Sequence, residues 1–135
     1  MKKTDAANAE RAAEHYAIQS LDCVRTLRAV RTRFARQDLF ASDVLGKRAD
    51  GTLVAIQVTT GKASAVSDRK RRLEAVPWHQ SDIVLLLQMH KEKLNGRSIR
   101  HFFRVLEYCV GSDGRRKWFP LYEVEVPRTW FRAAS

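Results

Sequence analysis

The sequence predicts one α/β domain over residues 1–135, with helices flanking a mixed β-sheet. Three observations predict this class. An alanine-rich segment with helical periodicity opens the chain, two aliphatic strand-like runs lie on either side of a basic helical segment, and two alternating runs end the chain. An aliphatic strand, a helix and a second aliphatic strand, in this order, are typical of parallel neighbours joined by a crossover.

The first third of the chain predicts a helix, a strand and a loop. Apolar residues recur at three- and four-residue steps over about 6–20 without Gly or Pro, and Thr4 or Asp5 can cap this helix. Alternation of apolar and basic residues then predicts a strand over 22–30. The irregular, basic segment 31–42 is expected to be a loop.

The middle of the chain predicts a β-hairpin that contains a central strand. A short strand over 43–47 leads to the Asp50-Gly51 pair, which is a strong signal for a tight hairpin turn. The partner strand, 53–59, is a near-continuous aliphatic run, which indicates burial on both faces.

The remaining segments complete the sheet. Ser64 or Ser67 can cap a basic helix that stops at Pro77, because proline disfavours the helical conformation of the residue before it. A second buried strand over 81–88 is expected to run parallel to 53–59 across this helix. Two further strands are expected over 99–110 and 116–126, joined by a glycine-rich turn.

Positive charge is the most unusual feature of the composition. Lys and Arg number 25 against 15 Asp and Glu, a net charge of +10, and 17 of the basic residues are arginines. Guanidinium groups match the geometry of phosphate, so this bias favours a nucleic-acid partner. A solvated basic surface without a specific partner is the alternative.

The sequence also bears on where the protein works. No apolar run approaches the roughly 20 residues that span a bilayer. The N-terminus lacks the apolar stretch of a secretion signal, and the two cysteines are too few for a disulfide framework. We therefore expect no membrane association and a cytoplasmic location, in a bacterium or in a phage-infected host cell.

Three polar residues of the predicted hairpin form the most informative pattern. Asp43 opens its first strand, and Gln57 and Thr59 lie on one side of its second strand because side chains alternate with period two. An unpaired amide in an aliphatic strand would be costly, so Gln57 should have a partner. Ligands of open α/β sheets bind at the C-terminal ends of strands, where this pair lies. The alternative is that Asp43 caps a turn and the other two hydrogen-bond within the hairpin.

This arrangement resembles the PD-(D/E)XK nuclease superfamily, which has the restriction-endonuclease-like fold, and within it the Holliday-junction resolvases. The resemblance covers roughly residues 6–90 in the order and spacing of elements. Asp43 matches the motif aspartate, and Gln57-Val58-Thr59 takes the place of Glu-x-Lys. Glu10 matches the glutamate on the first helix, with Glu14 one turn later as the competing candidate.

The resemblance implies a metal-dependent endonuclease. Such an enzyme would use Mg²⁺ or Mn²⁺ to hydrolyse phosphodiesters in branched or duplex DNA, including four-way junctions. The metal would be held by Asp43, Gln57 and Glu10. Because a junction has two-fold symmetry, the enzyme is expected to be a homodimer, with the aromatic C-terminal strand region as the candidate interface.

Two departures from the family pattern keep a second hypothesis open. Gln57 removes one negative charge from the site, although its amide oxygen can still bind a metal. Thr59 removes the ammonium that would stabilise charge on phosphate, so it would hold water or phosphate instead, and Lys62 or Lys70 would replace the missing lysine. The alternative function is a catalytically weakened DNA-binding or accessory protein with the same fold.

Clustered basic residues are the expected DNA contacts. Many arginines lie shortly before the candidate site or in the helix after it, where they could hold phosphates without reading sequence. The residues expected to contact DNA are Arg25, Arg28, Arg31, Arg33, Arg36, Lys62, Arg69 and Lys70.

Other chemistry-bearing residues give weaker signals. The four histidines lack the spacing of zinc ligands, and the sequence has no Ser-His-Asp pattern or phosphate-binding glycine loop. The three tryptophans are expected in the core or at a dimer interface more than on unpaired bases. A protein-binding inhibitor is a third functional class, and it predicts no salt-sensitive affinity for DNA.

Overall fold

The computed structural model of the protein describes residues 3–29, 39–96 and 98–134. The elements in chain order are α1 (Lys3–Ser20), β1 (Cys23–Arg28), β2 (Val44–Arg48), β3 (Leu53–Thr59), α2 (Ala63–Glu74), β4 (Ile83–Lys93), β5 (Ile99–Val110), β6 (Arg116–Val126) and the 3₁₀ turn η1 (Arg128–Phe131). Within these ranges, neither α-helix combines the length and the apolar character that crossing a bilayer demands.

The strands form one mixed sheet in the order β1-β2-β3-β4-β5-β6. The β3–β4 pair is parallel, and α2 makes the crossover between these two strands; the other four pairs are antiparallel. This sheet with its two helices confirms the α/β class that the sequence predicts.

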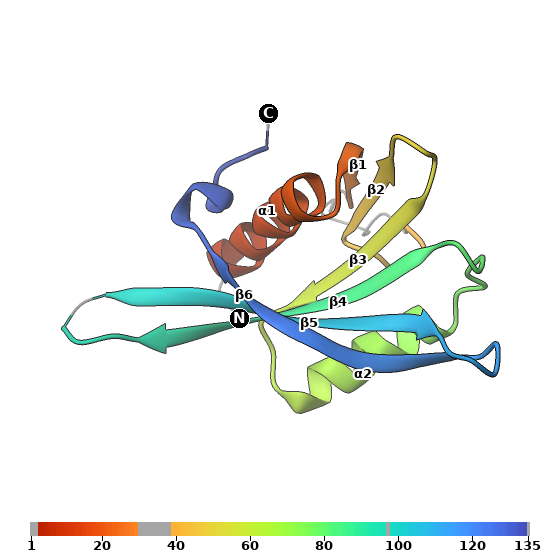
Figure 1. Ribbon diagram of the computed structural model, residues 1–135. Coiled ribbons are helices and arrows are strands. Elements are labelled where there is room, and N and C mark those ends of the chain that lie inside the picture. The colour runs from red at the N-terminus through yellow and green to blue at the C-terminus, as the bar shows by residue number, and fades with distance from the viewer. Residues whose placement is uncertain (1–2, 30–38, 97, 135) are drawn as a thin grey trace.

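The two helices lie on opposite faces of the sheet (Figure 1). The alanine-rich stripe of α1 packs on Val54, Ile56 and Val58 of β3, because small side chains let the helix approach the sheet closely. On the other face, Leu73 of α2 packs on Val84 and Leu86 of β4. The polar residues of β3 therefore point away from the α1 core.

Most predicted boundaries are confirmed. The helix over 6–20, the hairpin over 43–59 and the two C-terminal strands appear where the sequence predicts them. The strand predicted over 81–88 extends to Lys93, because it pairs with β5 as far as Ile99. Part of the predicted loop over 31–42 lies outside the described residues.

The predicted start of α2 is wrong. Neither Ser64 nor Ser67 caps the helix, which begins at Ala63 with Lys62 at the N-cap position and without a side-chain cap. The reason is a tight connection from β3, in which Gly61 passes too close to Ala65 for any larger residue: a Cβ atom on Gly61 would lie 2.6 Å from the Ala65 Cβ. The helix starts two residues after this glycine, at Ala63.

Candidate functional site

Three of the predicted site residues form a buried polar cluster at the C-terminal end of β3. The exposed fractions of Asp43, Gln57 and Thr59 are 1, 1 and 2%, respectively. Gln57 and Thr59 face α2, because they alternate along the strand with the residues that face α1. Polar groups at this depth need hydrogen bonds, so their partners define what the cluster does.

Asp43 is held by the backbone of β3. It directly precedes Val44, whose partner in the ladder is Ile56, so it lies opposite Gln57. The Asp43 amide donates to the Ile56 carbonyl at 2.8 Å, and its Oδ2 accepts the Val58 amide at 2.8 Å. The carboxylate is thereby fixed beside the strand that carries the other two polar residues.

Gln57 has partners on two different elements, as the sequence predicts for a buried amide. Its Nε2 donates to the carbonyl of Ala41, in the turn before β2. Its Oε1 accepts Nη1 of Arg69, on α2, at 2.9 Å. Because the amide nitrogen can only donate, the bond to Ala41 fixes the oxygen toward the Arg69 guanidinium.

Thr59 connects the cluster with the start of α2. Its Oγ1 accepts the amide of Gly61 at 3.0 Å, which stabilises the tight turn into the helix. Lys62 follows at the N-cap position. Within the described ranges, the Lys62 ammonium makes neither an ion pair nor a hydrogen bond.

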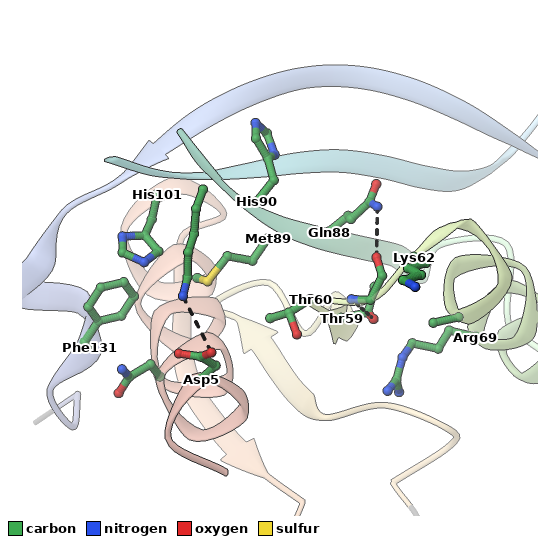
Figure 2. A pocket seen from close by; sticks show the side chains of 14 residues that line it. Asp5, Thr59, Thr60, Lys62, Arg69, Gln88, Met89, His90, His101 and Phe131 are labelled. Atoms are coloured by element: carbon green, nitrogen blue, oxygen red, sulfur yellow. Dashed lines mark hydrogen bonds and ion pairs between the residues drawn. The ribbon is translucent and has the colours of Figure 1, made fainter. Parts of the chain in front are cut away.

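A cleft of about 700 Å³ opens next to the cluster. Its walls come from the first turns of α1, the start of α2, the middle of β4, β5 and η1 (Figure 2). The residues that line it are Asp5, Asn8, Thr59, Thr60, Gly61, Lys62, Ala65, Arg69, Gln88, Met89, His90, Lys91, His101 and Phe131. Of the predicted site residues, Thr59, Lys62 and Arg69 are among them, whereas Asp43, Gln57 and Glu10 are not.

Positive charge is unevenly distributed over this cleft. On the wall opposite α2, the Lys91 ammonium lies 3.6 Å from the carboxylate of Asp5, which offsets its charge. Burial, together with the nearby Lys91, lowers the pKa of His101, which favours its neutral form. The basic residues on the α2 wall of the cleft are Lys62 and Arg69.

The two candidate glutamates on α1 differ in their surroundings. Glu14 is tied to β1: Thr26 Oγ1 donates to it at 2.6 Å, and Arg28 Nε lies 3.5 Å from it. Glu10 is 9% exposed and lies one turn nearer the cleft end of the helix. Both come from the face of the sheet opposite α2 (Figure 1). The choice of Glu10 stays a prediction.

The predicted DNA-contacting residues lie in several places. Arg25 is exposed on β1 beside an apolar groove, and Arg28 pairs with Glu14. The Lys70 ammonium lies 5.5 Å from the ring of Trp118, outside the cleft. Arg31, Arg33 and Arg36 lie outside the described residues. Among the described members of this set, Lys62 and Arg69 line the cleft.

Sequence reasoning missed the far wall of the cleft. Met89, His90 and Lys91 line it because β4 continues beyond its predicted end, and Gln88 and His101 line it from within predicted strands. The partner of Gln57 was also missed, although a signal existed. Arg69 stands seven residues after Lys62, a spacing that places both on one face of a helix.

The arrangement does not fit a divalent metal as it stands. In the described part of the chain, no three His, Cys, Asp or Glu side chains gather to hold an ion. The Gln57 oxygen, one of the predicted ligands, is bonded to a guanidinium instead. A metal at that oxygen would meet the Arg69 charge at close range.

Comparison with known proteins gives no further assignment. No family model matches the chain, no curated protein matches it, and no solved structure matches it. The site must therefore be interpreted from its own geometry.

Proposed function

We propose that this protein is a DNA endonuclease that resembles Holliday-junction resolvases of the PD-(D/E)XK superfamily. One observation carries the proposal: the buried Asp43–Gln57–Thr59 cluster ends the central strand β3 and adjoins a cleft whose α2 wall is cationic. The order of a helix, an antiparallel three-stranded unit, a crossover helix and a parallel strand supports it. The net charge of +10 supports a polyanionic substrate.

The residues of the chain have separate parts in this proposal. Lys62 and Arg69 hold the phosphates of a strand in the cleft, and Thr59 borders the place where that strand meets the cluster. Asp43 supplies the carboxylate that hydrolysis requires. The proposed cofactor is Mg²⁺ or Mn²⁺, which Asp43 and Gln57 would hold and which would polarise the scissile phosphate; in the structure the Gln57 oxygen accepts a hydrogen bond from Arg69.

A second candidate function is favoured by the same contact. If Arg69 stays on Gln57, the site has an organic cation where a nuclease has its metal. The protein would then bind DNA as an accessory or structural component without cutting it. Asp43, 1% exposed, is consistent with such a closed site.

We propose in addition that the protein acts as a homodimer on four-way junctions. β6 is an edge strand and carries three exposed large apolar side chains: Phe119, Leu121 and Tyr122. Exposed apolar edges are typical places for pairing with a second chain. Sedimentation velocity of the wild-type protein measures this directly, and a monomer at every concentration would contradict it.

Cleavage of a fluorescent four-way junction and of a linear duplex, in Mg²⁺, Mn²⁺ or EDTA, tests the enzymatic proposal. We expect cleavage with either metal and none in EDTA. Asp43→Asn should lower the cleavage rate at least about 100-fold while changing DNA affinity little, because Asp43 is buried and does not line the cleft. Asp113→Asn, in the exposed β5–β6 turn, is the matched control.

Three outcomes contradict parts of the proposal. Tight DNA binding without cleavage in any metal would contradict the endonuclease and support the second candidate function, DNA binding without cleavage. An active Asp43→Asn variant would mean that the site is elsewhere. Equal binding at low and high salt would exclude a phosphate-based interaction and favour a protein partner.

A further inference from the structure

We infer that the sheet face formed by β1, β2 and the start of β3 binds an extended peptide segment of a partner protein. The peptide carries acidic and apolar side chains at alternate positions of one face, and it adds to the outer edge of β1 as a further strand. In the described part of the chain, this surface and the cleft at Thr59 share no lining residue. The inference therefore goes beyond the proposed function and does not depend on DNA cleavage.

The first supporting feature is an apolar groove of about 710 Å³ on this face. Leu27 and Leu45 are cross-strand partners and form a continuous apolar surface along it. Leu27 is 65% exposed and Phe40 is 57% exposed, and grouped apolar side chains of this kind indicate an interaction site. The residues that line the groove are Arg25, Thr26, Leu27, Phe40, Leu45, Gly46, Lys47 and Leu53.

The second feature is the placement of the two helices, which leaves this part of the sheet uncovered. Leu73 of α2 packs on Val84 and Leu86 of β4, and Figure 1 shows α2 beneath β4 and β5, away from β1 and β2. On the other face, Thr26 Oγ1 donates to Glu14 of α1 at 2.6 Å. Because side chains alternate along a strand, the neighbours of Thr26 on either side face away from α1, into the groove.

The third feature is the charge of the groove. Arg25 and Lys47 are direct cross-strand partners, and like charges in such a pair repel each other. Within the described ranges, neither side chain has an ion pair or a hydrogen bond, and no acidic residue lines the groove. A carboxylate bound beside them would relieve this repulsion. The groove therefore complements a ligand that combines an acidic group with an apolar side chain.

The fourth feature is the free edge of β1. This strand is the first in the order of the sheet, and its ladder partner is β2 alone. An edge strand presents backbone N–H and C=O groups that can pair with another chain. A register shift at Val24 limits the regular part of β1 to 25–28. A strand added there places an acidic residue beside Arg25 and an apolar one beside Leu27, two positions apart in the peptide.

The chemistry of the groove favours a peptide over a nucleic acid. Unpaired bases bind by stacking on aromatic rings, and Phe40 is the one aromatic residue in the described lining. Its ring already meets that of Trp78 edge-on, with centroids 6.5 Å apart. The other large apolar side chains of the groove are leucines, which pack on aliphatic groups. Strand addition also uses the backbone of the ligand, which nucleic acid lacks.

The test is fluorescence anisotropy of a labelled synthetic peptide. In this test peptide, glutamate and leucine alternate on one face of the strand and threonine occupies the other. We expect saturable binding to the wild-type protein. A control peptide of the same composition has its glutamates and leucines on opposite faces. It should bind at least about 10-fold more weakly, because it cannot bury leucine in the groove and pair its acid with Arg25 at once. Equal binding of the two peptides would overturn the inference, since net charge alone would then explain it.

Variants of the protein locate the site. Arg25→Glu should weaken binding of the test peptide at least about 10-fold, because it replaces an attractive charge by a repulsive one. Leu27→Thr should weaken it about 5- to 20-fold through lost apolar contact. Arg115→Glu makes the same change of charge in the exposed β5–β6 turn, and it should stay within about 2-fold of wild type. Equal losses for Arg25→Glu and Arg115→Glu would contradict the proposed location.

Further measurements distinguish the other possible occupants. Circular dichroism and thermal melting establish that each variant is folded; if Arg25→Glu does not fold, Leu27→Thr decides the question. If oligothymidine displaces the test peptide and itself loses affinity in Leu27→Thr, the groove binds nucleic acid and the inference is wrong. If the peptide does not bind and sedimentation velocity shows self-association that Leu27→Thr abolishes, the occupant is a second copy of the chain and the inference is also wrong.

Discussion

The two faces of β3 differ sharply in chemistry although they belong to one seven-residue strand. Toward α1, Ile56 and Val58 pack on alanines in a dry core. Toward α2, Gln57 and Thr59 are equally buried but are polar, and they are satisfied by a guanidinium and by backbone groups. An all-apolar face would have been cheaper to bury, so the polar α2 face is the part of the strand on which the proposed function rests.

The largest expected effect concerns the apolar face. Ile56→Ala should lower the free energy of unfolding by about 2–5 kcal/mol, because it removes methylene groups at a fully buried position and leaves a cavity under α1. Urea denaturation followed by circular dichroism measures this loss. Ile56→Val should cost only about 0.5–1.5 kcal/mol. A loss below about 1 kcal/mol for the alanine variant would mean that the α1 core is not packed as described.

An intermediate effect is expected at Gln57. Gln57→Met keeps the length of the side chain but removes one hydrogen bond from the Ala41 carbonyl and one from Arg69, at a cost of about 1–3 kcal/mol. Gln88→Met is the matched control, since Gln88 donates one longer bond, 3.3 Å, to the carbonyl of Gly61. Thermal unfolding of both variants compares them. A Gln57→Met variant more stable than wild type would show that the polar contacts of this face have no structural value.

The smallest effect is expected at Thr59. Thr59→Val removes the acceptor of the Gly61 amide without changing the shape of the side chain, and should cost about 1 kcal/mol. Thr59→Ser, which keeps the hydroxyl, should retain the turn. Chemical denaturation gives both values. If the valine variant matches wild type while the serine variant loses stability, the methyl group and not the hydroxyl holds the turn.

The sequence predicts the sheet better than the site, for physical reasons. Strands 53–59, 99–110 and 116–126 are predicted within a residue or two because alternation, aliphatic runs and glycine turns are local signals. The start of α2 is not, because the helix begins at Ala63 without a side-chain cap, so no capping motif in the sequence marks it.

The sequence predicts only the part of the candidate site that depends on local signals. The burial of Gln57 follows from its aliphatic neighbours, and its need for a partner follows from burial. Which residue becomes that partner depends on how α2 lies across the sheet, and the sequence alone favoured Lys62 or Lys70 as the replacement cation. The structure instead brings Arg69 to Gln57 and leaves Lys70 over Trp118.

The proposed function requires that DNA bind in the cleft next to the polar face of β3, where Thr59 and Arg69 line the wall. Backbone amide shifts in two-dimensional NMR spectra, recorded while a DNA duplex is added in EDTA, test it most directly. We predict the largest shifts at Thr59, Gly61, Lys62 and Arg69, with smaller ones at the cleft-lining part of β4. Shifts confined to β1 and β2, with the start of α2 unchanged, would contradict the claim.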